Sequence, residues 1–465
     1  MINDLARLIE INTTSAPASE GAPFGIGNRK ALDVFCDMAK NYGLAVGNDD
    51  GYAAWAEYGD GQRLIGILGH LDVVPAGSGW STDPFRLTVE NGMLIGRGVS
   101  DDKGPVVACL HALARLKKEN VKLNGRVRLI VGSNEEEGSA CVKHYVKHCE
   151  VPVVAFTPDS DFPVTASEKG ILHLEISLSL SDLAANSYCS IEGGEKANIV
   201  PNFCKVVIKN SSAIYKKLSA CAVPADIPKT EKVALALATH GCDLADFSIY
   251  PSGENIEMTA RGTAAHASTP LKGDNAVTKM LVLLAALSDD EALNLAAEIF
   301  GTRRPEEKLG IACRDESGEM TVNVGVCRKT GSKLALTLDF RIPACTNAEE
   351  VIKAVKAVFG FNAEYKTLHS SPVLSVDENG LLVRTLMQVY RECTGDNESK
   401  PLHIGGGTYA KELPCCVAFG AVFPGRDTHM HDADECYPVE DFYKLEEIYY
   451  KAILALDKAF SVAER

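Results

Sequence analysis

Residues 64–75 read LIGILGHLDVVP, and this stretch decides more about the fold than any other in the chain. The segment Leu64–Leu68 is apolar throughout, as expected of a strand that is buried on both faces of a parallel sheet. His70 and Asp72 follow two residues apart, and alternate residues of an extended chain point to the same side. His70 could therefore ligate a metal while Asp72 hydrogen-bonds the other ring nitrogen, although a histidine at a strand end is more often only structural.

Acidic residues follow two further segments in the same way. The pair Asp101-Asp102 stands between glycine-rich turns, directly before a helical segment at 106–116. These acids could cap the helix, or Asp101 could ligate a metal. Three consecutive acids, Glu135–Glu137, come soon after the apolar run 127–131. Adjacent residues at a strand end point in different directions, so one glutamate could bind a metal while its neighbour transfers protons, unless the run is only a solvated turn.

A fourth apolar run, 153–156, ends shortly before Asp159. In open α/β sheets ligands bind outside the carboxyl ends of the strands, and all four acidic segments stand at such ends. Far along the chain, residues 427–434 read DTHMHDAD. This segment would bring His429 or His431 to the same site if the C-terminal part folds back onto the first half.

Composition limits the class of protein. A chain of 465 residues exceeds the usual size of a single core, about 250 to 300 residues, so two domains are expected. A net charge of -15 argues against nucleic acid and anionic membrane surfaces as partners. The start of the chain lacks a basic segment followed by an apolar core, so we expect a cytoplasmic protein. The 15 cysteines are odd in number and form no Cys-x-x-Cys pair, so we expect them to be reduced.

The pattern of segments predicts an α/β fold with an insertion. Apolar runs and amphipathic helical segments alternate in the first part, which indicates a mostly parallel sheet with helices on both faces. Segments of strand-like alternation, such as 171–180 and 334–341, follow. We therefore expect a catalytic metal-binding domain from residues 1–172 and 372–465, and an inserted α+β lid domain from residues 173–371.

These motifs together resemble the M20 family of dinuclear metallopeptidases, in order and approximate spacing. The closer likeness is to its bacterial PepV-type, or Xaa-His, dipeptidases. The motifs that carry the resemblance are His70-x-Asp72, Asp101-Asp102-Lys103-Gly104, Glu135-Glu136, Asp159 and Met430-His431, and flanking support comes from Glu168-Lys169-Gly170, Gly405-Gly406-Gly407-Thr408-Tyr409 and Phe423-Pro424-Gly425.

The resemblance implies a site with two divalent metal ions, for which Zn is the most direct choice and Mn or Co would serve. It implies that Glu135 is the general base and acid, that Asp72 supports His70, and that the Asp101–Asp102 peptide bond is cis. The implied ligands are His70, Asp101 and Asp159 for one ion, and Asp101, Glu136 and His431 for the other.

The resemblance also implies how the substrate is held. His266 from the insertion would stabilise the oxyanion, and Asn198 and Arg341 would bind the terminal carboxylate. An aspartate at position 159 favours a substrate with a free amino terminus, for which Asp102 would offer a counter-charge. The expected activity is hydrolysis of dipeptides by a monomer, because a long insertion is typical of members whose lid serves their own chain.

Several alternatives stay open at this stage. The catalytic register could shift by one residue, to Glu136 as base and Glu137 as ligand, and His429 competes with His431. An N-acyl amino acid deacylase, an aminopeptidase and a catalytically silent peptide-binding homologue are the other functions considered. The sequence assigns no role to four further histidines, His111, His144, His148 and His403.

Overall fold

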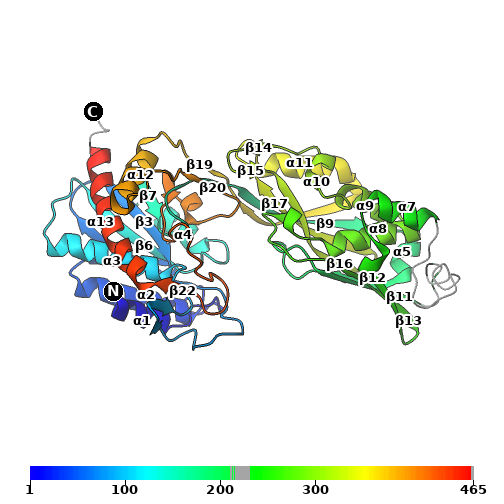
Figure 1. Cartoon of the computed structure of the whole chain (residues 1–465), viewed down its shortest axis with the longest axis horizontal. Helices are drawn as coiled ribbons and strands as arrows, with labels where there is room; N and C mark the ends of the chain where they lie inside the picture. The colour runs from blue at the N-terminus through cyan, green and yellow to red at the C-terminus, as the bar shows by residue number, and fades with distance from the viewer. Residues whose placement is uncertain (210–211, 213, 215–230, 462–465) are drawn as a thin grey trace. The chain divides into compact units, whose positions relative to one another are not determined.

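The computed structural model describes residues 1–209, 212, 214 and 231–461, and these divide into two compact units. The first unit comprises Met1–Ser167 and Leu374–Arg465, and the second comprises Glu168–Val373. The second unit is therefore inserted into the first in sequence (Figure 1). The insertion that we expect at 173–371 lies inside the second unit.

The first unit is built on a mixed sheet of nine strands within the described residues. Four neighbouring strands at its centre run parallel: β6 (Arg126–Gly132), β3 (Leu64–His70), β7 (Val154–Thr157) and β21 (Cys416–Ala418). The α/β class is confirmed, and the parallel order holds at the centre. Antiparallel pairs at the margins involve β1 (Ala45–Asp49), β2 (Ala53–Gly59) and β8 (Thr165–Glu168), and the sheet also includes β19 (Leu374–Ser375) and β20 (Leu402–Ile404).

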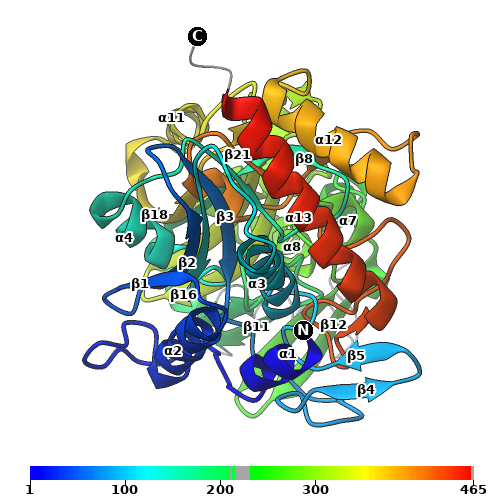
Figure 2. The same cartoon turned by 90° about the vertical axis from the view of Figure 1, so that its left-hand side faces the viewer.

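Helices cover both faces of this sheet, which is why all seven residues of β3 are buried. Ile67 packs into the larger core of the unit, whereas its neighbour Leu68 packs on the other face with Tyr145 and Tyr409. Figure 2 shows α3 and α13 on one side of β3 and α4 on the other. The larger core receives α1 (Ile2–Ile9), α2 (Ile26–Asn41), α3 (Lys103–Lys118), α12 (Leu381–Thr394) and α13 (Val439–Ser461), and the smaller core receives α4 (Ala140–His148) and the short 3-10 helix η4 (Tyr409–Glu412).

A small three-stranded sheet completes the first unit within the described residues, from β22 (Cys436–Pro438), β5 (Met93–Ile95) and β4 (Thr88–Glu90). Among the helices described in the whole chain, none combines the length and the apolar composition needed to cross a membrane.

The second unit is an α+β structure, as expected, with eight strands in its main sheet among the described residues. Alternate residues of β9 (Gly170–Ser179) are buried, so one face of the sheet carries the hydrophobic core of this unit. In sheet order the strands are β12 (Phe247–Ser252), β13 (Asn255–Arg261), β11 (Phe203–Lys209), β10 (Tyr188–Gly193), β16 (Thr321–Thr330), β17 (Lys333–Ile342), β9 (Gly170–Ser179) and β18 (Ala363–Ser371). Its helices are α5 (Asp182–Ser187), α7 (Glu231–Thr239), α8 (Ala276–Ser288), α9 (Glu291–Phe300), α10 (Pro305–Lys308) and α11 (Ala348–Phe359), with a hairpin of β14 (Arg314–Asp315) and β15 (Gly318–Glu319).

Candidate metal centre

The parallel centre of the first sheet brings three polar segments to one edge. His70 is the last residue of β3 and lies in register with Gly132, the last residue of β6. The glutamates at 135–137 follow β6, and Asp159 stands two residues after β7. The carboxyl ends of parallel strands meet at the same edge, so these segments converge although they are far apart in the chain.

The first candidate metal group consists of His70, Asp101 and Asp159, whose ligand atoms all lie within 4.8 Å of one another. His70 Nε2 is 2.9 Å from Asp101 Oδ1 and 3.8 Å from Asp159 Oδ2. The other ring nitrogen of His70 lies 3.0 Å from the carbonyl oxygen of Asp72, to which Nδ1–H can donate. This contact leaves Nε2 to face the two carboxylates, which is the orientation of a metal-binding histidine.

Asp72 supports this site differently from the sequence expectation. Its carboxylate lies 3.5 Å from His70 Nδ1, farther than its own carbonyl oxygen. The two carboxylate oxygens instead accept hydrogen bonds from the backbone amides of Glu135 at 3.0 Å and Glu136 at 3.1 Å. Asp72 therefore fixes the loop that carries both glutamates, and it holds the His70 ring mainly through its backbone.

The second candidate group consists of Asp101, Glu136 and His431. His431 Nε2 is 2.9 Å from Asp101 Oδ2 and 3.4 Å from Glu136 Oε1. Each oxygen of Asp101 thus faces one imidazole, and this buried carboxylate belongs to both groups. Glu137 and His429 are exposed and belong to neither group, so the geometry favours Glu136 and His431 over these alternatives.

The charges of these residues fit a divalent cation. The pKa of Glu136 is raised by burial and by the charge of Asp101. The hydrogen bonds of His431 to Asp101 and Glu136 raise the pKa of His431 to about 11. Positive charge is therefore stabilised strongly here, and a metal ion would supply it in place of protons. Two imidazoles and three carboxylates suit Zn, and also Mn or Co.

Glu135 stands beside the two groups without belonging to either. Burial and the charge of Asp159 raise the pKa of Glu135 well above its ordinary value. A carboxyl group with a raised pKa can both accept and return a proton near neutral pH, which is the property required of a general base and acid.

The three residues predicted to hold the substrate lie in the second unit, at one end of its sheet. The carbonyl oxygen of Asn198 accepts a hydrogen bond from the amide of Ala267, next to His266, at 2.9 Å. Thr321, which pairs with Arg341 across β16 and β17, donates its hydroxyl to the carbonyl of Ala267 at 3.2 Å. Segments that carry Asn198, His266 and Arg341 are thus in contact within this unit.

The side chains of His266 and Arg341 are oriented by neighbours. His266 Nδ1 accepts a hydrogen bond from the amide of Ser268 at 3.2 Å, so the proton of the neutral ring is on Nε2. Arg341 is buried, and its Nε and Nη2 donate to the two carboxylate oxygens of Asp339 at 2.8 and 3.1 Å. Burial and the charge of Arg341 lower the pKa of His266, which keeps the ring neutral.

Comparison with known families decides the classification. The family model described as Peptidase family M20/M25/M40 matches residues 66–455, a span that runs from β3 to α13 and contains every candidate ligand. This chain belongs to peptidase family M20. It is therefore a peptide hydrolase of a metal-dependent family, as the sequence motifs predict.

Named relatives of this M20 peptidase match it over nearly the whole length. A protein named "Putative dipeptidase YtjP", from Bacillus subtilis (strain 168), is 33% identical over 98% of this chain and 97% of its own. "Putative dipeptidase SH1171", from Staphylococcus haemolyticus (strain JCSC1435), is 32% identical with the same coverage.

Solved structures agree in fold. Human carnosine dipeptidase 1 gives a TM-score of 0.57 at 16% identity, covering 98% of this chain and 96% of its own. Aminoacylhistidine dipeptidase from Vibrio alginolyticus gives a TM-score of 0.53 at 13% identity, with the same coverage. The M20 peptidase thus shares its fold with these two dipeptidases.

Asp102, which we expect to offer a counter-charge to the amino terminus of the substrate, has a fully buried side chain. Its Oδ2 accepts a hydrogen bond from the backbone N–H of His70 at 3.1 Å. Asp102 therefore fixes the end of β3. The Asp101–Asp102 peptide bond is cis, as the family resemblance implies.

The sequence did not reveal the part played by Glu435, which is almost completely buried. Its carboxylate accepts hydrogen bonds from the backbone amides of Gly98, Ser100 and Asp101, at 2.9, 2.9 and 3.2 Å. The guanidinium of Arg97, also buried, donates to it at 2.7 Å. Glu435 thus secures the loop that presents Asp101. Its position four residues after His431 was the only sequence signal, and several other acids surround that histidine.

Proposed function

We propose that this M20 peptidase hydrolyses dipeptides at a centre of two divalent metal ions. One ion would be held by His70, Asp101 and Asp159, and the other by Asp101, Glu136 and His431. The observation that carries the proposal is the position of Asp101, because each of its carboxylate oxygens lies 2.9 Å from a different imidazole nitrogen. A carboxylate placed in this way can bridge two cations.

The reaction that follows from these residues is attack of water on a peptide carbonyl. Two divalent ions bound by these residues would supply an acidified water molecule and polarisation of the carbonyl. Glu135 takes the proton of the attacking water and returns it to the departing amine. Its raised pKa suits both steps. Asp72 keeps Glu135 in place through the backbone hydrogen bond at 3.0 Å.

The second unit would bind the substrate and select for its length. His266 carries its proton on Nε2, and this N–H would donate a hydrogen bond to the oxyanion of the tetrahedral intermediate. Asn198 and Arg341 would bind the carboxylate of the second residue, and Asp339 orients the guanidinium. A site that holds both ends of the substrate disfavours longer peptides, which supports a dipeptidase over a general aminopeptidase. The names of the bacterial relatives agree with this choice.

The proposal includes a chain that acts as a monomer in the cytoplasm, with His266 serving its own active site. The length of the insertion supports the first point. The cysteines support the second, since those among the described residues are free, which is typical of reducing compartments.

The test is replacement of Glu135 in protein saturated with Zn, Mn or Co. We expect Glu135→Ala to lower kcat for dipeptides by at least about 100-fold, with unchanged metal content, because a general base contributes about 100- to 10,000-fold. Glu137→Ala is the matched control, since this neighbouring acid is exposed, and we expect it to stay within about twofold of the parent.

The same assay distinguishes the alternatives. Turnover of free dipeptides, tripeptides and N-acylated amino acids would be compared for the parent protein. Faster turnover of N-acylated amino acids than of dipeptides would favour the deacylase. Turnover of tripeptides equal to that of dipeptides would favour the aminopeptidase. Undiminished dipeptide hydrolysis by metal-loaded Glu135→Ala would refute the mechanism.

A further inference from the structure

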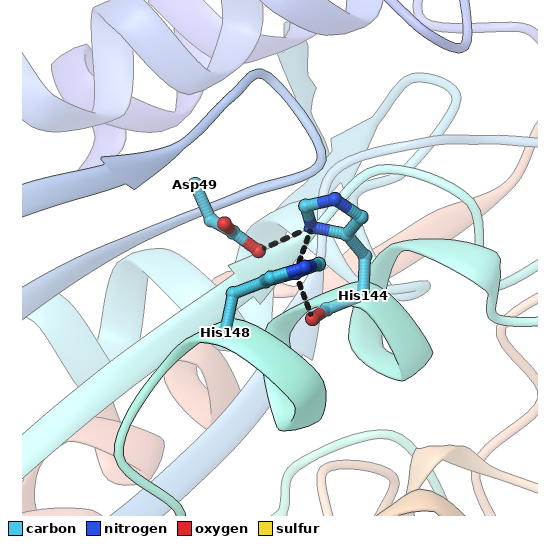
Figure 3. Close-up of side chains that lie close together, drawn as sticks. All are labelled: Asp49, His144 and His148. Atoms are coloured by element: carbon cyan, nitrogen blue, oxygen red, sulfur yellow. Dashed lines mark hydrogen bonds and ion pairs between the residues drawn. The ribbon is translucent and has the colours of Figure 1, made fainter.

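A third group of side chains that could hold a metal ion lies in the first unit, apart from the residues of the candidate catalytic centre. It consists of Asp49, His144 and His148 (Figure 3). The two histidines are four residues apart on α4, so they share one face of the helix. Asp49 is the last residue of β1 and approaches from a different segment.

The donor atoms of this group converge on one point. His144 Nδ1 is 2.8 Å from Asp49 Oδ2 and 3.1 Å from His148 Nδ1. His148 Nδ1 also lies 2.9 Å from the carbonyl oxygen of His144. Neighbouring ligands of a tetrahedral zinc ion are separated by roughly 3.3 Å, given zinc–ligand distances of about 2.0–2.1 Å. Small side-chain rotations would therefore open this group to fit an ion.

The environment of Asp49 favours a cation. Its side chain is only 7% exposed, and within the described part of the chain its carboxylate forms an ion pair with His144 and with no lysine or arginine. Each imidazole can carry its proton on Nε2, and the two Nδ1 lone pairs then face each other at 3.1 Å beside the Asp49 carboxylate. A metal ion would satisfy both lone pairs and the carboxylate together.

Two of the three donors are held in place by packing. The ring of Tyr52 stacks on His144, with centroids 3.8 Å apart and planes inclined by 4°. The amide of Tyr52 donates to the carbonyl of Asp49 at 2.8 Å, which closes the turn after β1. His148 is exposed and can adjust its rotamer at little cost. Asp49 and His144 are thus already in place, and a rotamer change of His148 would complete the site.

We propose that Asp49, His144 and His148 bind a third divalent metal ion, with Zn²⁺ as the best match for two imidazoles and one carboxylate. The ion ties α4 to the end of β1. This role is structural. Because α4 follows directly on the loop of Glu135 and Glu136, an ion that holds α4 in place would also stabilise that loop. Asn134 Oδ1 accepts the amide of Ala140, the first residue of α4, at 3.1 Å.

The test is to count and titrate bound zinc in protein first freed of metal with a chelator. We expect the parent chain to bind one more Zn²⁺ than His148→Gln and Asp49→Asn, or to bind that ion at least about tenfold more tightly in competition with a chromophoric chelator. Because only a difference of one ion is measured, the result does not depend on how many ions the proposed catalytic centre holds.

The matched control is His111→Gln. His111 also pairs with an aspartate, Asp4, at 2.8 Å, but this pair belongs to no group of three donors among the described residues. We expect the control to bind as much zinc as the parent. A second readout is hydrogen exchange of the α4 amides, which zinc should slow in the parent and in the control but not in His148→Gln.

Equal zinc stoichiometry and affinity in the parent, Asp49→Asn and His148→Gln would overturn the proposal. His148→Gln decides the matter even if Asp49→Asn fails to fold, since His148 is exposed and its replacement removes a ligand without disturbing the core. Failure of this test leaves dipeptide hydrolysis unaffected, and failure of the Glu135 test leaves the extra zinc ion unaffected, so the two proposals are separable.

Discussion

At the scale of single residues, the candidate centre depends on carboxylates that hold the loops as much as on those that face a metal. Asp72 binds the amides of Glu135 and Glu136, and Glu435 binds three amides of the loop that ends at Asp101. A buried carboxylate that accepts several backbone hydrogen bonds fixes the loop that donates them. Each of them holds a proposed metal ligand, Glu136 or Asp101, through the backbone amide of that ligand.

The first prediction concerns Glu435. Both of its oxygens accept hydrogen bonds, so the amide nitrogen of Glu435→Gln would face a donor in either orientation and would leave buried Arg97 without a counter-charge. We expect a loss of about 3 to 5 kcal/mol in the free energy of unfolding, as found for broken buried ion pairs. Metal affinity should fall about 10- to 100-fold, because support of a ligand is lost.

Denaturant unfolding and metal titration measure these two effects. Glu440→Gln is the control, since Glu440 is exposed and pairs with Arg426 at the surface. Its effect should stay within about 0.5 kcal/mol. A similarly small effect of Glu435→Gln would show that the loop holds Asp101 without this carboxylate.

At the scale of elements, strand direction determines where the polar residues gather. The parallel strands β3, β6 and β7 deliver His70, the glutamate loop and Asp159 to one edge. In the second unit the antiparallel β16 and β17 place Thr321 opposite Arg341, and Asp339 stands two residues earlier on β17, on the same face as Arg341. The carboxylate of Asp339 pairs with the guanidinium of Arg341 and also contacts the imidazole of His173.

The second prediction concerns how the contribution of Asp339 to the stability of the second unit depends on pH. Burial opposes its charge, but the hydrogen bond of His173 and the charge and hydrogen bond of Arg341 outweigh burial and lower the pKa of Asp339. A lowered pKa in the folded state means that this stabilisation is present above the ordinary value, about 3.9, and is lost as pH falls through the folded pKa.

Asp339→Asn should therefore destabilise the second unit by about 1 to 3 kcal/mol at pH 7, and by less at pH 3. Denaturant unfolding at both pH values measures this. Glu298→Gln, an exposed change in the same unit, should have little effect at either pH. A difference between parent and Asp339→Asn that grows toward acid pH would contradict the sign of the shift.

At the scale of the whole molecule, the two units have separate hydrophobic cores. All ligands of the candidate catalytic centre, and the three residues of the proposed zinc site, belong to the first unit. A ligand stabilises only the unit that binds it. Metal binding should therefore raise the unfolding temperature of the first unit and leave that of the second unit unchanged.

The third prediction follows for calorimetry with and without a chelator. An ion present at 100 times its Kd adds about 2.7 kcal/mol, which corresponds to roughly 5 to 10 °C in Tm for a unit of this size. Chelation should lower the transition of the first unit by at least this amount and leave that of the second unit in place. Added Zn, Mn or Co should reverse the change. An equal shift of both transitions would show that the units unfold together.

The order of motifs along the chain was sufficient to predict the α/β class, the M20 family and the placement of acids at strand ends, because apolar runs and the residues that follow them are local properties. The family resemblance already favoured Glu136 and His431 over Glu137 and His429, and the tertiary structure brings these two side chains to Asp101. It also revealed Glu435 beneath the Asp101 loop and the meeting of Asp49 with two histidines that the sequence left without a role. Three of these contacts join residues 95, 330 and 334 positions apart, and no local pattern encodes which of several similar residues will meet across such distances.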